Sequence, residues 1–207
     1  MKSQTLLILW LVVSILLLSG CIEGKQGSTT TAETNPATLS HLREWKADGV
    51  ISPNEYPHKQ SLAGGKFIVY WRNDGEYLYM ALKGQTTGWV AIGFEPSNAM
   101  KDADIIFGWV KNGQVIVIDA YSTGTYGPHP PDEELGGTND ILEYAGKEED
   151  EYTVIEFKRR LDTGDHYDKS LIPSQKVKFI FALADSDEFT QKHNIIRGSG
   201  ELTLDKA

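Results

Sequence analysis

Hydrophobic and polar residues alternate along most of the chain after about residue 60, with a period of two. In residues 66–72 the apolar side chains of Phe67, Val69 and Trp71 share one face. Because successive side chains of a strand point to opposite faces of its sheet, this period predicts half-buried β-strands. Runs of this kind predict strands at residues 66–72, 76–83, 87–94, 104–111, 114–121, 140–145, 152–159, 177–184 and 200–204.

Turn signals separate these runs. Asp74-Gly75 and Asn112-Gly113 each lie between two alternating segments and predict tight hairpins. An acidic turn is expected at residues 148–150, and the long loop of residues 122–137 is rich in glycine and proline, as functional or mobile loops are. Short, regularly spaced strands without an amphipathic helix predict an all-β fold, an immunoglobulin-like antiparallel β-sandwich of about 9–11 strands.

The N-terminal segment has the pattern of a secretory signal. Lys2 precedes an apolar run at residues 6–18, and Leu-Ser-Gly then precedes Cys21, as in a lipobox. We therefore expect residues 1–20 to be a signal peptide, Cys21 to be lipidated, and residues 21–40 to be a flexible Thr- and Ser-rich tether. An uncleaved N-terminal anchor helix is the alternative. Either form places residues 41–207, one domain, outside the cytoplasm and tethered to the cell membrane.

Charge and cysteine content exclude several classes of function. The chain has 29 acidic and 20 basic Lys or Arg residues, a formal net charge of −9, which argues against nucleic-acid binding. Cys21 is the only cysteine, so an internal disulfide, a thiolate zinc site and an iron–sulfur cluster are excluded. There is no Cys-x-x-Cys-His motif, and any haem would be held noncovalently.

Met100 and His193 are the candidate metal ligands. Met80 falls in an apolar strand and is expected in the core, whereas Met100 falls in a polar loop that gives it no obvious packing role. His193 precedes the last predicted strand. A thioether and an imidazole together suit haem iron. From the residues alone, a surface histidine remains the alternative for His193.

Separated motifs resemble the DOMON domain family. They are Gly88-Trp-Val-Ala-Ile-Gly-Phe94, then Met100-x-x-Ala-Asp-Ile, and finally His193-x-x-x-Arg-Gly198; the likeness spans about residues 48–204. The resemblance implies a β-sandwich that either binds haem b or serves as a haem-free ligand-binding or interaction module. In the haem-binding members a loop methionine and a C-terminal histidine are the axial ligands, and Met100 and His193 match those positions. Arg197 is then expected to pair with a haem propionate, against the alternative of an ordinary surface ion pair.

Carboxylates suggest a second metal. Asp102, Asp104, Asp119 and Asp140 form a candidate oxygen-ligand set for Ca²⁺, and the resemblance implies a metal near Asp104 in some haem-free members. Turn capping is the default explanation for such residues. Asp104 and Asp119 are the candidate calcium ligands.

Together these features predict a membrane-tethered, extracytoplasmic b-type cytochrome that passes single electrons to a redox partner protein. The alternative is a haem-free DOMON domain that binds a sugar, another small ligand or a protein. Catalysis by this chain alone is not expected, because no Ser-His-Asp order, paired-carboxylate motif or open metal triad is present.

Overall fold

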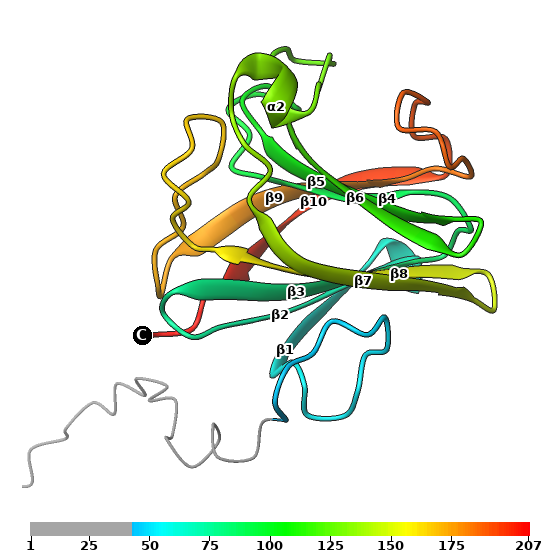
Figure 1. Cartoon of the computed structure of the whole chain (residues 1–207), viewed down its shortest axis with the longest axis horizontal. Helices are drawn as coiled ribbons and strands as arrows, with labels where there is room; N and C mark the ends of the chain where they lie inside the picture. Colours follow the sequence, from blue (N-terminus) through cyan, green and yellow to red (C-terminus); the bar gives the residue numbers. More distant parts are fainter. Residues whose placement is uncertain (1–42) are drawn as a thin grey trace, which may run out of the picture. The chain divides into compact units, whose positions relative to one another are not determined.

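The computed structural model describes residues 43–207, which form two antiparallel five-stranded sheets. The predicted signal peptide (1–20), Cys21 and the tether (21–40) lie outside the described residues, and their predictions stay untested. Within residues 43–207 there are ten strands, so the prediction of an all-β sandwich is confirmed (Figure 1). None of the helices in this range has the length and hydropathy needed to cross a membrane.

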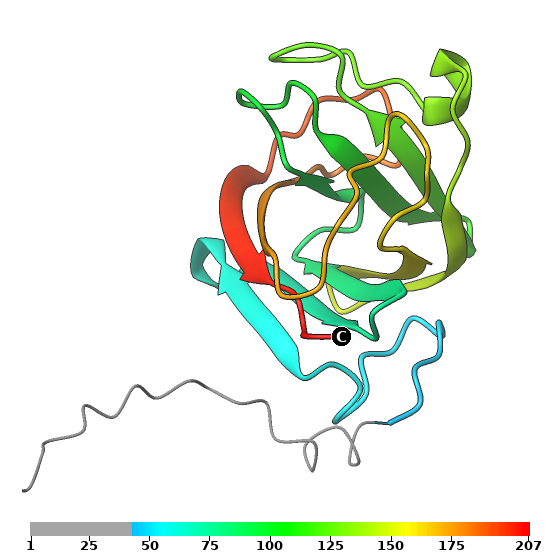
Figure 2. The same ribbon diagram turned by 90° about the vertical axis from the view of Figure 1, so that its left-hand side faces the viewer.

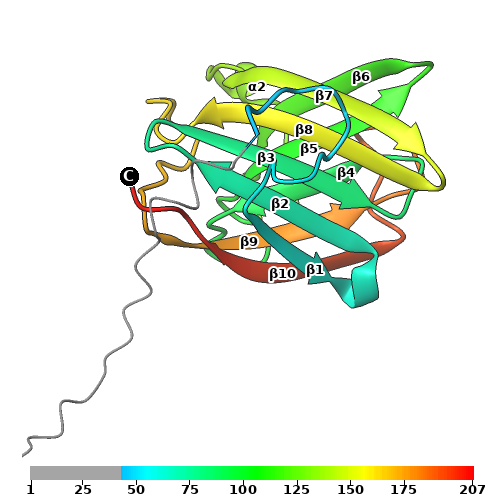
Figure 3. The same ribbon diagram turned by 90° about the horizontal axis from the view of Figure 1, so that it is seen from below.

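One sheet, called sheet A here, has the strand order β1-β2-β3-β8-β7. Its strands are β1 (His58–Leu62), β2 (Phe67–Asn73), β3 (Tyr77–Gly84), β8 (Tyr152–Arg160) and β7 (Ile141–Glu149). A short 3₁₀ turn, η1 (Ala63–Gly65), joins β1 to β2. Figure 3 shows this sheet from its outer side, with β1 and β7 at its two edges.

The second sheet, sheet B, has the order β10-β9-β4-β5-β6. Its strands are β10 (Ile196–Thr203), β9 (Lys176–Leu183), β4 (Val90–Phe94), β5 (Asp104–Lys111) and β6 (Gln114–Tyr121). A one-turn helix, α2 (Asp132–Leu135), interrupts the long loop after β6. This loop and the β9–β10 loop both lie on the side of sheet B that faces away from sheet A (Figures 1 and 2).

The main core lies between the sheets and follows from the period-two pattern. On β2 the inward-pointing residues Phe67, Val69 and Trp71 are buried. Met80 of β3 also belongs to this core and has no exposed surface. Phe67 stacks on Phe181 of β9, with ring centroids 4.7 Å apart, which joins the two sheets. Met80 is therefore core filler, as its strand pattern predicts.

The predicted hairpins at residues 74–75 and 112–113 are present. At the second, Asn112 and Gly113 both have positive φ, 53° and 76°, which matches the tight turn that this dipeptide favours between antiparallel strands.

Some boundaries differ from the predictions. Strand β1 was not predicted, because His58–Leu62 is mostly polar. Strand β10 begins at Ile196 rather than at residue 200, since pairing with β9 orders a glycine-rich segment that has weak strand propensity. The acidic turn falls at Asp150 and Glu151, so Glu148 and Glu149 belong to β7.

The central strands of sheet B, β4 and most of β5, are buried on both faces. All five residues of β4 are buried, and a second apolar cluster, separate from the main core, covers its outer face. This cluster includes Trp89, Trp109, Ile105 and Phe107, with Met100 packed against it. A surface that soluble proteins usually leave polar is thus apolar here, which marks the outer face of sheet B as the place to look for a ligand.

Candidate functional site

A cavity of about 750 Å³ lies on the outer face of sheet B. Cavities for cofactors and small molecules typically have about 300–1,000 Å³ and mostly apolar walls. Its walls include apolar residues from β4, β5 and β9, among them Ala91, Ile105, Phe107, Ile180 and Ala182, and polar residues from the surrounding loops. The cavity can therefore take a sizeable ligand with a largely apolar body.

Small residues make room for this cavity. Ala91 and Gly93 of β4 lie beside Ala182 and Ile180 of β9 in the strand register. At Gly93 an added Cβ would meet the side chains of Ile105 and Ile180 at 3.0 Å. A larger side chain at that position would crowd the neighbouring strands.

The loop between β4 and β5 brings Met100 to the cavity. The Met100 amide donates to the carbonyl of Thr125 at 3.2 Å, and the Asp102 amide donates to the carbonyl of Ser122 at 2.8 Å. These bonds join the Met100 loop to the long loop after β6. The thioether is half-buried against the outer apolar cluster, although its sequence neighbours are polar.

The β9–β10 loop brings His193 to the same cavity. The neighbouring Asn194 fastens this loop, because its Nδ2 donates to the Asp185 carboxylate at 2.6 Å and its Oδ1 accepts from the Asp185 amide at 3.1 Å. Burial, with the positive charges of Arg197 and Lys192, lowers the pKa of His193. A neutral imidazole, the form that binds metals, is favoured.

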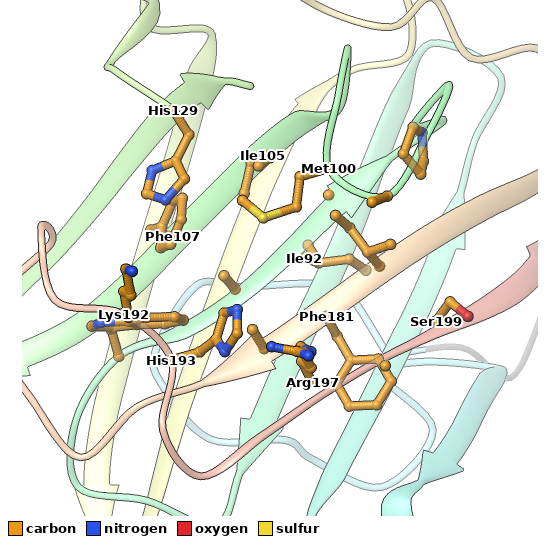
Figure 4. Close-up of a pocket in the computed structure, with 18 of the residues that line it drawn as sticks. Ile92, Met100, Ile105, Phe107, His129, Phe181, Lys192, His193, Arg197 and Ser199 are labelled. Carbon is orange, nitrogen blue, oxygen red and sulfur yellow. The ribbon is translucent and has the colours of Figure 1, made fainter. Parts of the chain in front are cut away.

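Met100, His193 and Arg197, which the sequence singled out, all line this one cavity. In Figure 4 the side chains of Met100 and His193 extend into the pocket from opposite sides, and Arg197 lies beside His193. Lys192 also lines the cavity. The structure thus brings together two segments that are far apart in the sequence.

The long loop after β6 contributes two further residues. His129 lines the cavity and packs against Phe107 and Phe189, with centroid distances of 5.0 Å and 5.5 Å, and burial lowers its pKa. Tyr126 lines the mouth and is 88% exposed. Tyr121, the last residue of β6, packs on Tyr167.

The residues present fit a haem b group. The cavity combines apolar walls, a soft thioether, a neutral imidazole and exposed cations in one space. Those are the chemical groups that the ring, the iron and the propionates of haem require.

A second candidate site lies in the interior, near one end of the sandwich. Asp104 of β5, Asp119 of β6 and Asp168 each offer a carboxylate oxygen, and these oxygens all lie within 4.8 Å of one another. The fully buried Arg159 of β8 donates to Asp104 at 2.6 Å, and its Nη2 lies 3.5 Å from Asp168. The structure therefore brings the predicted calcium ligands Asp104 and Asp119 together.

Asp132 of α2 lies outside this group of three but is a buried carboxyl group that interacts electrostatically with Asp104 and Asp168. Sequence reasoning missed both Asp132 and Asp168. Asp132 is 1% exposed, and neither of its carboxylate oxygens has a hydrogen-bond partner in the described chain. One oxygen each of Asp104 and Asp119 is likewise without a partner. Buried polar atoms are normally paired, so these oxygens are candidate ligands for a cation.

The pKa shifts of these buried groups also favour a cation at this site. Burial, followed by repulsion from Asp104 and Asp168, raises the pKa of Asp119 to about 8 and that of Asp132 to about 7. Burial alone would lower the pKa of Arg159, but Asp104, Asp168 and Asp119 raise it above its usual value. One guanidinium does not balance this number of buried carboxylates.

The other two aspartates of the predicted set do not contribute side chains to this cluster. Asp102 accepts from the hydroxyl of Ser97 at 2.5 Å, as a turn-capping residue does. Asp140 approaches through its backbone, with its amide donating to Asp119 at 2.9 Å. Its carboxylate accepts from Thr138.

An antiparallel sandwich with an apolar cavity on one outer face is the architecture of a ligand-binding or cofactor-binding module. The DOMON domain family model matches residues 63–184, more than half of the chain, and the chain belongs to this family. The resemblance seen in the sequence motifs is thereby confirmed.

Relatives share the domain within longer proteins. The DBH-like monooxygenase protein 1 of Mus musculus is 36% identical over 156 residues, which cover 72% of this chain and 24% of that protein. The Homo sapiens protein of the same name is 35% identical over 157 residues, covering 74% of this chain and 25% of its own length. The chain thus matches about a quarter of these relatives.

Among solved structures, the cytochrome domain of Myriococcum thermophilum cellobiose dehydrogenase is similar in fold. The TM-score is 0.49 at 14% identity, over 67% of this chain and 75% of that domain.

Proposed function

We propose that this DOMON domain binds haem b noncovalently and carries single electrons outside the cytoplasm. The observation that supports this most is the placement of Met100 and His193 on one apolar cavity of about 750 Å³. Each residue comes from a different loop, and Met100 also packs against the outer apolar cluster. A loop thioether facing a neutral imidazole suits a metal with two axial positions.

When bound, haem b supplies a one-electron couple at its iron. Met100 and His193 would hold the iron, and ligation by both side chains favours electron transfer over oxygen activation. Ile105, Phe107 and Ile180 would exclude water from the ring, and Arg197 would pair with a propionate at the mouth. A redox partner would dock at the open side of the cavity, with a lipid on Cys21 holding the domain at the membrane.

The full-length chain, purified in detergent, tests this proposal by titration with haemin. We expect saturable uptake of one haemin per chain and a Soret band that shifts on reduction. The Met100→Ala/His193→Ala double variant in the same detergent corrects for haemin dissolved in micelles. Uptake by that variant equal to the wild type would refute the proposal.

We also propose a structural Ca²⁺ site at Asp104 and Asp119, with Asp132 and Asp168 as further ligands. The unpartnered buried oxygens of Asp104, Asp119 and Asp132 support it, because Ca²⁺ takes six to eight oxygen ligands. A cation there would join β5 and β6 to α2, which lies within the long loop after β6. Calorimetric titration of the chelator-treated chain with Ca²⁺ tests the site.

A further inference from the structure

The cavity lining differs in charge from the rest of the chain. Its residues include two cations, Lys192 and Arg197, and two histidines, but no aspartate or glutamate. In the whole chain, acidic residues outnumber Lys and Arg by 29 to 20. A locally positive mouth on an acidic protein attracts negative ligands and is otherwise unexpected.

Neither cation has a carboxylate partner within 4.0 Å in residues 43–207, whereas cations such as Arg159, Arg160 and Lys158 do. Lys192 lies in the β9–β10 loop, and Arg197 lies in β10 directly opposite Ala182 of β9. Ala182 is too small to cover the guanidinium. Both side chains are exposed at the mouth, free to meet a ligand.

We propose that Lys192 and Arg197 form a two-point carboxylate clamp, which makes the cavity selective for flat apolar ligands with two acidic side chains, that is, dicarboxylic tetrapyrroles. The apolar walls would hold the ring while each cation pairs with one carboxylate. The clamp deepens the proposed haem function, since it assigns Lys192 a role in specificity. It does not depend on iron.

Iron-free protoporphyrin IX and its dimethyl ester test the clamp without involving Met100 or His193. Binding to the full chain is followed by porphyrin fluorescence. We expect the wild type to bind the diacid more tightly than the ester, and high salt to reduce this preference. Because both cations are exposed, Lys192→Gln and Arg197→Gln should each weaken diacid binding about fivefold, and the double variant about twentyfold. Ester binding should not change.

Lys178→Gln is the matched control, since Lys178 is an exposed lysine of β9 that does not line the cavity. Equal affinity of the wild type for diacid and ester, no detectable porphyrin binding, or an equal loss in Lys178→Gln would overturn the clamp. A diacid preference without any axial-ligand spectrum from haemin would leave the clamp standing and refute the haem proposal. Haemin ligation without a preference for the diacid would support the haem proposal and refute the clamp.

Discussion

Arg159 Nη1 lies 2.6 Å from Asp104 Oδ2, and neither side chain has any exposed surface. This ion pair crosses the sandwich, because Arg159 belongs to β8 of sheet A and Asp104 to β5 of sheet B. It also receives the Lys169 amide, which donates to the same Asp104 oxygen at 2.8 Å. The pair therefore ties both sheets and the β8–β9 connection together beneath the long loop.

Arg159→Gln should destabilise the domain strongly. The substitution leaves buried carboxylates without their cation, and breaking a buried pair costs about 3–5 kcal/mol. The adjacent Arg160 is the control, because its pair with Glu76 is about half exposed and Arg160→Gln should cost less than about 1 kcal/mol. Urea denaturation measures both changes, and equal losses would show that the interior pair has no special importance.

Calcium should stabilise the domain. A ligand that binds only the folded state adds about 2.7 kcal/mol when its concentration is 100 times Kd. Thermal unfolding with Ca²⁺ and with chelator measures the gain. Asp132→Asn should reduce it, whereas Glu133→Gln, at an exposed neighbour in α2, should keep it. A gain that survives in Asp132→Asn would exclude that residue as a ligand.

Filling the cavity should abolish haemin uptake while the fold persists. Ala182→Phe adds a ring in the space above sheet B, where Ala182 lines the cavity. We expect no saturable haemin binding and an unfolding free energy within about 1 kcal/mol of the wild type. Ala145→Phe on β7 of sheet A should leave haemin binding intact. Normal uptake by Ala182→Phe would place the haem elsewhere.

The two hydrogen bonds between Asn194 and Asp185 should position His193. Asn194→Ala removes the two hydrogen bonds that fasten the β9–β10 loop, so the imidazole must be ordered on binding. Haemin affinity is expected to fall about fivefold to tenfold, while the spectrum of the saturated protein stays that of the wild type. Stopped-flow release of haem measures the change. A changed spectrum would mean that Asn194 affects ligation itself.

Local patterns in the sequence predict much of the fold. Asn112-Gly113 specifies its hairpin through positive φ, and alternation such as Phe67, Val69, Trp71 specifies the buried face. Segments ordered by tertiary pairing were missed or shortened. Strand β1 is mostly polar, and β10 contains Gly198 and Gly200 within its length.

The candidate site likewise has residues that the sequence identified and residues whose role depends on tertiary structure. The family motifs identified Met100 and His193, although nothing local to either residue shows that they meet. Asp132 and Asp168 were missed because their burial depends on loops folding over the end of the sandwich around Arg159. An arginine at an inward position of the alternating segment 152–159 was the one available signal that acidic partners would be buried nearby.

The most direct test of the haem proposal is the reduced-minus-oxidised absorption spectrum of the full chain after haemin titration. The wild type is expected to give the bands of a six-coordinate, low-spin b-type haem. Met100→Ala and His193→Ala should each lose them, whereas Met80→Leu in the core and His166→Ala on the surface should retain them. Spectra unchanged in both ligand variants, or no haemin-dependent bands in the wild type, would contradict the account.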